Sequence, residues 1–172
     1  MSTLIGDGSH ARDIRATRSF THYVAHHDDF HGTDAVTIGI NQPQLRAQVA
    51  KELDIHDLSW VHPDAYLGPN VTMGYGTHVN YRASMTRTKI GRHCTISPGV
   101  TICGDVKIGD RVLVGAGATI CDRVYIGNDV IIGAGAVVLP ETTIHDGETW
   151  YGVPARCRPL LRQIVPGDIE FR

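Results

Sequence analysis

The sequence predicts a mainly β protein, in which a small α/β domain precedes a parallel β-helix. Two observations lead to this fold class. From Leu67 onward an aliphatic residue returns every six positions for about seventy residues, as in "KIGDRVLVGAGATI", and a six-residue period is the signature of a parallel β-helix. Before residue 62, short strand-like runs alternate with helix-like segments, a pattern typical of α/β folds.

The repeat has an aliphatic residue at its first position, which we call position i. Position i+4 is small or apolar in almost every rung, and position i+1 is usually Gly or another small residue, where the chain turns tightly. Each rung is therefore expected to be one short strand and one corner, because only stacked rungs bury the i residues in a continuous core. Thirteen residues keep the pattern without a polar substitution: Leu67, Met73, Val79, Met85, Ile90, Ile96, Ile102, Ile108, Val114, Ile120, Ile126, Ile132 and Val138.

One rung breaks the period. Met85 to Ile90 spans five residues where its neighbours span six. A deletion inside a solenoid must distort one corner, and such irregularities are common beside working sites. A tolerated loop change is the alternative.

Bulk composition excludes several classes of partner. The formal net charge is −2 and the pI is about 6.5, so nothing indicates a nucleic-acid or membrane partner. No apolar run approaches the ~18 residues of a membrane-spanning helix, and no secretion signal is recognisable. The four cysteines lack metal-type spacing. We therefore expect a cytoplasmic protein with free thiols and no metal.

The front end carries a phosphate-binding pattern. Gly6, Gly8 and Ala11 fit G-x-G-x-x-G/A between a strand at 3–5 and a helix-like segment, where glycines let backbone approach a phosphate. Asp28 and Asp29 follow a second strand about twenty residues later, where an acidic residue can meet a ribose hydroxyl. We expect about half of a dinucleotide-binding fold, able to hold one nucleotide. A purely structural cap on the solenoid is the alternative.

A third strand at 35–41 is expected to lead into a helix. Asn41 is expected to cap this helix, with Pro43 in its first turn. Leu45, Val49 and Leu53 would share its buried face. The domain prediction is a small α/β nucleotide-binding domain at 1–61, a hexapeptide-repeat β-helix at 62–150 and a tail closing the helix at 151–172.

Three features of residues 67–156 stand out: the "IGxxxxI" rungs, "IGAGAVV" and "YGVPARCRP". Through these features this region resembles the hexapeptide-repeat acyltransferases, which fold as left-handed triangular β-helices with three rungs per coil. The α/β front domain, joined through "VHPDA", narrows the resemblance to the sialic-acid and UDP-4-amino-sugar acetyltransferases. This resemblance implies an acyl group, most simply acetyl, passing from acetyl-CoA to a nucleotide-linked amino sugar or similar polar amine. It also implies a homotrimer with the CoA site between neighbouring chains.

The resemblance also implies binding residues. On the acceptor side they are Gly8, Ser9, His10, Asp28, Asp29 and, from an "I-N-x-x-A" match, Asn80. On the CoA side they are small residues that let the thioester arm pass close to the backbone, and one arginine for the phosphates: Gly104, Gly115, Gly133, Ala134 and Arg156.

The family's catalytic histidine is missing from its usual place. Thr86 or Arg87 stands there, beside the short rung, and neither type of side chain is a competent base near pH 7. Counting along the columns puts His78 directly beneath Thr95, one strand spacing of ~4.8 Å away. His78 and His93 are therefore the candidate general bases. For each of them, a merely solvated exterior position is the alternative.

Two other function classes stay open at this point. One is a non-catalytic nucleotide-sugar-binding or scaffold relative that has lost the base. The other is a metal-dependent hydratase of the γ-carbonic-anhydrase kind, which needs three converging histidines on neighbouring coils, whereas His78 and His93 have no third partner. Cys103 and Cys121, eighteen residues apart, are expected to stack on adjacent coils as small corner residues rather than as a disulfide.

Overall fold

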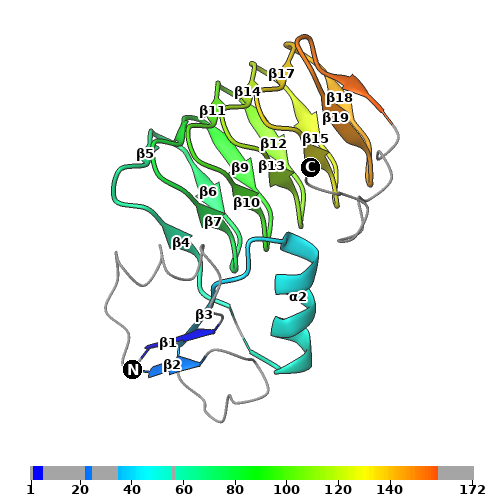
Figure 1. Ribbon diagram of the computed structural model, residues 1–172. Helices are drawn as coiled ribbons and strands as arrows, with labels where there is room; N and C mark the ends of the chain where they lie inside the picture. The colour runs from blue at the N-terminus through cyan, green and yellow to red at the C-terminus, as the bar shows by residue number, and fades with distance from the viewer. Residues whose placement is uncertain (1, 6–21, 25–34, 56, 159–172) are drawn as a thin grey trace, which may run out of the picture.

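The computed structural model describes residues 2–5, 22–24, 35–55 and 57–158. A tall β-solenoid makes up most of this part of the chain (Figure 1). A small three-stranded sheet lies at one end of the molecule, and the helix α2 (Pro43–Glu52) lies between that sheet and the first solenoid coils. Among these residues no helix is long and apolar enough to cross a membrane.

Three parallel sheets, visited in turn, form the solenoid, so that three strands make one coil. Face 1 contains β4 (Trp60–Val61), β7 (His78–Val79), β10 (Thr95–Ile96), β13 (Leu113–Val114), β16 (Ile131–Ile132) and β19 (Thr149–Tyr151). Face 2 contains β5 (Tyr66–Leu67), β8 (Ser84–Met85), β11 (Thr101–Ile102), β14 (Thr119–Ile120) and β17 (Val137–Val138). Face 3 contains β6 (Thr72–Met73), β9 (Thr88–Ile90), β12 (Val106–Ile108), β15 (Tyr125–Ile126) and β18 (Thr143–Ile144). We call the corners edge 1–2, edge 2–3 and edge 3–1.

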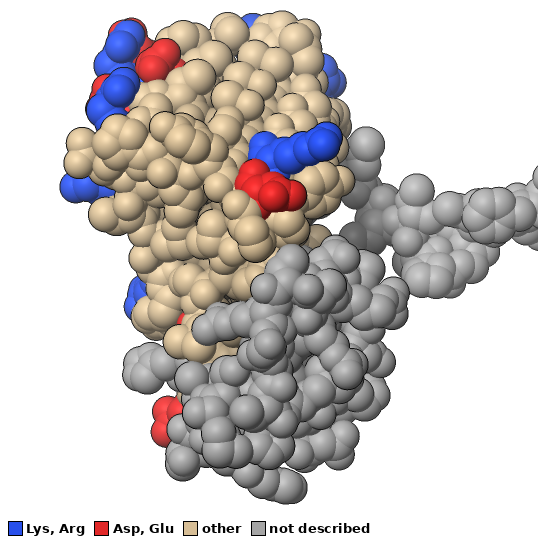
Figure 2. All heavy atoms as spheres, turned by 90° about the vertical axis from the view of Figure 1, so that its left-hand side faces the viewer, with Lys and Arg blue, Asp and Glu red and all other residues tan. Residues whose placement is uncertain are grey.

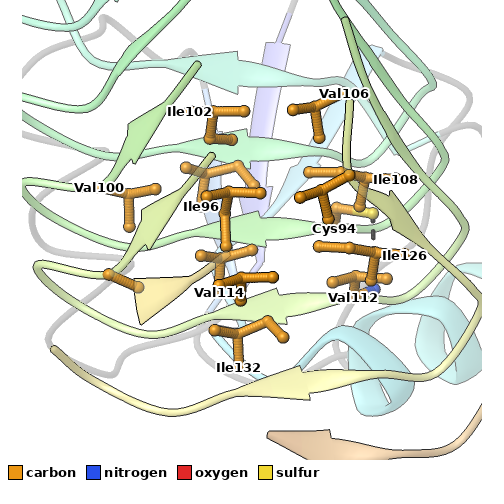
Figure 3. Close-up of a cluster of buried hydrophobic side chains, with 14 of the residues drawn as sticks. Cys94, Ile96, Val100, Ile102, Val106, Ile108, Val112, Val114, Ile126 and Ile132 are labelled. Carbon is orange, nitrogen blue, oxygen red and sulfur yellow. Dashed lines mark hydrogen bonds between the residues drawn. The ribbon is translucent and has the colours of Figure 1, made fainter. Parts of the chain in front are cut away.

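The hexapeptide prediction is confirmed strand by strand. Each i residue ends a short strand and pairs with the i residue one coil away, as Ile102 does with Ile120 and Ile108 with Ile126. Successive coils place these side chains above one another in the interior (Figure 3). The i+4 residues from Ala83 to Ala136 are also fully buried. One of them, Cys94, donates from its thiol to the Gly109 carbonyl.

The one-residue deletion in the short rung shortens one corner of the solenoid. Thr86 and Arg87 alone separate β8 from β9, whereas three residues separate the corresponding strands one coil above. Arg87 takes a φ of 45° to close this tighter turn, and its carbonyl accepts a hydrogen bond from the Asp105 N–H at 3.0 Å. Pairing is back in register at Thr88, so the deletion changes edge 2–3 and leaves the sheets intact.

The small sheet consists of β1 (Ser2–Ile5), β2 (His22–Val24) and β3 (Ala35–Ile38), all parallel, in the order β2-β1-β3. Two expectations for the following helix are wrong. Its N-cap is Gln42 rather than Asn41, and no side chain caps it. Its buried residues are Pro43, Arg46, Val49 and Ala50, while Leu45 is 43% exposed. The buried face of the helix is rotated relative to the expected one, because Arg46 rather than Leu45 contacts the solenoid.

The solenoid extends slightly beyond the boundaries expected at 62 and 150. The strand β4 already belongs to face 1 through its pairing with β7. At the far end β19 runs to Tyr151, and β20 (Arg156–Cys157) folds back antiparallel on it. The left-handed sense of the coil stays a prediction from the resemblance.

Candidate functional site

A groove separates α2 from edge 3–1 of the solenoid, with a cavity volume of about 640 Å³. The helix contributes Gln44, Gln48 and Lys51 to its walls, and the solenoid contributes Tyr75, Arg92, His93 and Arg111. With Asp54, which also lines the groove, the walls combine amides, cations, one carboxylate, one phenol ring and one imidazole. Such a surface suits a polar ligand with several hydrogen-bonding groups.

Arg46 joins the helix to the solenoid behind this groove. Its side chain is completely buried, and burial lowers its pKa to about 10. The guanidinium donates to the carbonyls of Gly76, His93 and Cys94 at 2.8 Å each, and also to the Ile40 carbonyl. Because its N–H groups donate to backbone carbonyls, Arg46 has a structural role, connecting the helix to the solenoid, and is not a ligand-binding group.

The carboxyl group of Asp57 lies against the same guanidinium. Its Oδ2 is 3.6 Å from Arg46 Nε and 3.7 Å from His93 Nδ1, and its Oδ1 accepts from the Ile38 N–H at 2.8 Å. Burial raises the pKa of Asp57, although its three neighbours oppose the rise. A β-carbon on Gly76 would stand 2.3 Å from His93 Nδ1, so only glycine permits this approach.

The histidine candidates lie in different surroundings. His78 lies in register with Thr95, as column counting predicted. It has no exposed surface and packs edge-on against Trp60 at a ring-centroid distance of 6.2 Å. His93 lies at edge 3–1, meets the Tyr75 ring edge-on at 5.1 Å and lines the groove. The solvated alternative fails for both, because the residues are 0% and 7% exposed.

The two arginines of the groove are held by aspartates one coil above them. Arg92 pairs with Asp110 at 2.6 Å, and Arg111 pairs with Asp129 at 2.7 Å. Burial alone would raise the pKa of Asp110, but the hydrogen bonds from Arg92 hold it below its ordinary value. Figure 2 shows, on one side of the molecule, charged groups of both signs lying next to each other.

The proposed CoA residues fall on two different edges. Gly104 lies at edge 2–3, where a β-carbon would stand 1.9 Å from Arg87 Nη2. Gly115, Gly133 and Ala134 lie at edge 1–2. They therefore do not line one groove along a single edge of one chain.

The glycines of edge 1–2 divide into two kinds. A β-carbon on Gly115 or Gly133 would strike the next coil, so these positions serve coil stacking. Gly117 and Gly135 have φ values of 67° and 66° and nothing within 4 Å of a β-carbon position. Together with the exposed Ala134, they leave an open strip without large side chains.

The remaining predicted site residues are more scattered. Asn80 is 6% exposed, and its amide donates to the Ile96 carbonyl one coil above, at 3.0 Å. Arg156 lies exposed in β20 at the far end of the solenoid. The five front-end residues lie outside the described residues: Gly8, Ser9, His10, Asp28 and Asp29.

Sequence reasoning missed Arg46 and Asp57. A signal for Arg46 existed, because it lies at helical spacing from Pro43, Val49 and Ala50. Asp57 belongs to no motif, so nothing in its neighbourhood pointed to burial. Within the described ranges no three His, Cys, Asp or Glu side chains gather as metal ligands, and all four cysteines are free.

Comparison with known proteins agrees with this architecture. Residues 87–122 match the family model described as bacterial transferase hexapeptide (six repeats). No curated protein is significantly similar to the chain in sequence.

Solved structures match over nearly their whole length. A mutant of perosamine N-acetyltransferase from Caulobacter crescentus, in complex with CoA and GDP-perosamine, superposes with a TM-score of 0.74 at 21% identity, covering 92% of this chain and 96% of that one. WeeI from Acinetobacter baumannii gives 0.73 at 18% identity, with 92% and 99% covered. The acetyltransferase domain of PglB from Neisseria gonorrhoeae, with acetyl coenzyme A, gives 0.68 at 20% identity, with 91% and 98% covered. The chain thus carries bacterial-transferase hexapeptide repeats and shares the fold of these three solved structures.

Proposed function

We propose that this protein transfers an acyl group, most simply acetyl, from acyl-CoA to an amine on a nucleotide-linked sugar. The observation that carries the proposal is the full-length match: the α/β front end and the solenoid together cover 96% of a perosamine N-acetyltransferase that holds CoA and GDP-perosamine. A shared solenoid alone would not indicate a nucleotide-sugar acceptor. Nothing in the comparisons supports the non-catalytic alternative.

The front domain is the proposed acceptor-binding part. Its three parallel strands in the order β2-β1-β3 are compatible with half of a Rossmann-like dinucleotide-binding fold. Gly8, Ser9, His10, Asp28 and Asp29 would hold the nucleotide in this proposal. Asn80, whose amide already bonds to backbone, would contribute through its carbonyl oxygen.

The open strip of edge 1–2 supports a place for CoA. The space beside Gly117 and Gly135 admits an extended pantetheine arm near the backbone. Gly104, on edge 2–3, would join the same site if edge 2–3 of one chain lay against edge 1–2 of the next. This arrangement is the proposed homotrimer, and Arg156 would pair with CoA phosphates there. We also propose a cytoplasmic location.

An assay of acyl transfer tests the proposal. Purified protein is mixed with acetyl-CoA and a panel of nucleotide-linked amino sugars, and free CoA thiol is measured together with the mass of the product. We expect thiol release that depends on the acceptor and a product heavier by one acetyl group. Absence of transfer to every amino sugar, with hydroxyl acceptors also unchanged, would contradict the proposed function.

A binding measurement separates the donor from the acceptor. A ligand that binds only the folded chain raises its stability by RT ln(1 + [L]/Kd), so a thermal-shift screen detects either class. Both acetyl-CoA and a nucleotide sugar should raise the melting temperature. Stabilisation by the sugar nucleotide alone would favour a binding protein without transferase activity.

A further inference from the structure

Among the described residues, four arginines at the solenoid corners pair with an acidic residue one coil above, and one of the four is held differently. The pairs are Arg87–Asp105, Arg92–Asp110, Arg111–Asp129 and Arg123–Glu141. In the last three pairs the guanidinium donates through both Nε and Nη2, at distances between 2.6 and 3.0 Å. Arg87 donates through Nε alone, at 3.3 Å. Within the described part of the chain its Nη1 and Nη2 donate to no acceptor.

This difference coincides with the short corner. Only Thr86 and Arg87 connect β8 to β9, and Arg87 has a φ of 45°, compared with 56° for Arg123 in the same column. Its guanidinium lies over Gly104, where a β-carbon would stand 1.9 Å from Nη2 and 2.7 Å from Cζ. The missing side chain of Gly104 therefore makes the room for this guanidinium. Because a guanidinium binds polar and anionic oxygens through its terminal N–H groups, Nη1 and Nη2 are available to a ligand.

The backbone beneath the guanidinium is fixed on both sides. The Gly104 N–H donates to Asp122 Oδ1 at 2.9 Å, and the Gly104 carbonyl accepts from the Arg123 N–H at 3.0 Å. The carbonyl of Arg87 itself accepts from the Asp105 N–H at 3.0 Å. The Arg87 side chain thus rests on an ordered corner while remaining 50% exposed. Hydrogen-bond donors held in place before a reaction are the kind that stabilise charge developing during it.

Position along the solenoid decides which part of an acyl donor could meet Arg87. The small sheet of the front domain lies at one end of the solenoid (Figure 1), and Arg156 in β20 lies at the other. Arg87 lies in the second coil from the front-domain end, and it is the first cation along edge 2–3 from that end. In the proposed arrangement Arg156 takes the CoA phosphates and the front domain takes the acceptor. The thioester, at the opposite end of CoA from its phosphates, would then meet the acceptor near the Arg87 coil.

We propose that Arg87 is a catalytic residue, whose Nη groups donate hydrogen bonds to the thioester carbonyl oxygen and stabilise the negative charge that this oxygen acquires during transfer. The inference rests on the proposed acyl transfer and on a donor site where edge 2–3 of one chain meets edge 1–2 of the next. Arginine stays protonated near neutral pH and cannot act as a base, so its contribution is electrostatic. Asp105, through its bond to Nε, orients the guanidinium.

The chemical step balances without another reactant. The neutral amine nitrogen attacks the thioester carbonyl carbon, the new N–C bond forms, and an electron pair moves onto the carbonyl oxygen, where Arg87 stabilises it. The carbonyl then re-forms, the C–S bond breaks, and its electron pair leaves with the CoA sulfur. The proton that the amine nitrogen loses goes to that sulfur. The products are an amide and free CoA thiol, and Arg87 keeps all of its protons.

Substitution of the arginine tests the catalytic role. Arg87→Ala should lower kcat by ~10²–10³-fold, because removing one donor to a developing oxyanion typically costs that much. The Kd for acetyl-CoA, measured by isothermal titration, should change little, since the interaction strengthens only in the transition state. Arg123→Ala is the matched control and should keep its kcat. Arg123 lies in the same column two coils above, and two hydrogen bonds hold its guanidinium to Glu141.

Three results would overturn the assignment. The first is a wild-type kcat in Arg87→Ala, and the second is an equal loss of kcat in Arg123→Ala. The third is weaker binding of acetyl-CoA or of the sugar nucleotide with an unchanged kcat, which would indicate a contact to a phosphate group instead.

Free guanidinium separates a chemical role from a structural one. In Arg87→Ala the space over Gly104 is vacated, so guanidinium chloride, far below the concentrations that unfold the protein, should restore part of kcat. Potassium chloride at the same ionic strength should not. The double variant Arg87→Ala/Gly104→Ala should not be rescued, because its added β-carbon occupies the place of the guanidinium. Absence of rescue in the single variant, or equal rescue in both, would contradict the proposed role.

The contact can also be observed without turnover. Acetyl-CoA labelled with ¹³C at the carbonyl carbon is bound in the absence of an acceptor, and infrared difference spectra record its C=O stretch. Hydrogen bonds from a cation weaken this bond, so the frequency should fall on binding to the wild type and stay near that of free acetyl-CoA in Arg87→Ala. Equal frequencies in the two complexes would refute the role of Arg87. A wild type that binds acetyl-CoA without transferring the acetyl group would contradict the proposed function, and the frequency would still decide the contact. Failure to bind acetyl-CoA would overturn both.

Discussion

Arg46 Nε lies 3.6 Å from Asp57 Oδ2, and neither side chain has any exposed surface. This pair connects α2 to the segment that leads into the solenoid. Desolvation offsets much of the attraction in such a buried pair, so its presence alone is weak support for stability. Removing one partner is different, because the other charge then stays buried without compensation.

Arg46→Met tests this connection. The substitution leaves Asp57 uncompensated and removes the donors that serve the carbonyls of Gly76, His93 and Cys94. We expect a loss of about 3–5 kcal/mol in the free energy of unfolding, measured by urea denaturation. Arg46→Lys should also be destabilised, because an ammonium group cannot reproduce the planar fork. A change below ~1 kcal/mol in both variants would show that the contacts are not formed in solution.

Asp110→Asn should destabilise the protein at neutral pH but not in acid. The folded-state pKa of Asp110 is lowered, so its contribution is present above the unfolded value of about 4 and is lost as pH falls through the folded value. We expect a cost of at most ~1 kcal/mol at pH 7, since the pair is partly exposed. Asp110 Oδ1 also accepts a hydrogen bond from the Arg92 N–H at 2.8 Å. An asparagine at position 110 should keep this bond, because Asn128 Oδ1 accepts the equivalent bond from the Asp110 N–H one coil above. A difference between wild type and variant that grows in acid would contradict this account.

The cysteines should differ sharply in reactivity. Cys157 is exposed, whereas Cys94 is buried and its pKa is raised to about 11 by burial. Thiolate is the reactive form, so iodoacetamide at pH 8 should label Cys157 first and Cys94 only after unfolding. Peptide mass spectrometry measures the order, and labelling in denaturant, where all four thiols should react, is the control. The raised pKa also means that Cys94 costs stability only as pH rises above about 9. Early labelling of Cys94 would show that the coil opens there.

Two glycines make a matched pair for coil stacking. A β-carbon on Gly115 would stand 2.5 Å from the Ala134 backbone nitrogen, whereas one on Gly104 would meet the movable end of Arg87. Gly115→Ala should therefore cost about 1–3 kcal/mol through overpacking. Gly104→Ala should stay within about 1 kcal/mol, because the guanidinium can swing away. Urea denaturation of both variants measures the contrast, and equal costs would contradict it.

Gly104→Val tests the proposed donor site. The valine would displace Arg87 and fill the space over the short corner, so acetyl-CoA affinity should fall by ~10-fold or more while assembly is unchanged. Isothermal titration measures the affinity. Light scattering should still give three times 18.7 kDa, the proposed trimer, for wild type and variant alike. Unchanged affinity would place the cofactor elsewhere, and a monomeric wild type would contradict the shared site.

The sequence by itself determined the solenoid, because an i residue every six positions leaves a buried column only when coils stack. It therefore predicted the strands, the buried i+4 positions and the register of His78 with Thr95. It did not predict which face of α2 is buried. That face is set by Arg46, whose guanidinium donates hydrogen bonds to carbonyls up to 48 residues away in the chain.

Tertiary structure alone decided the candidate site. Asp57 and His93 are far apart in the chain and share no motif, and they meet only because the helix and the first coils pack around Gly76. Likewise, a search for small residues does not show that Gly104 and Gly115 lie on different edges of the solenoid. Periodicity encodes repeated local contacts, whereas a single long-range contact between polar groups leaves no period to find.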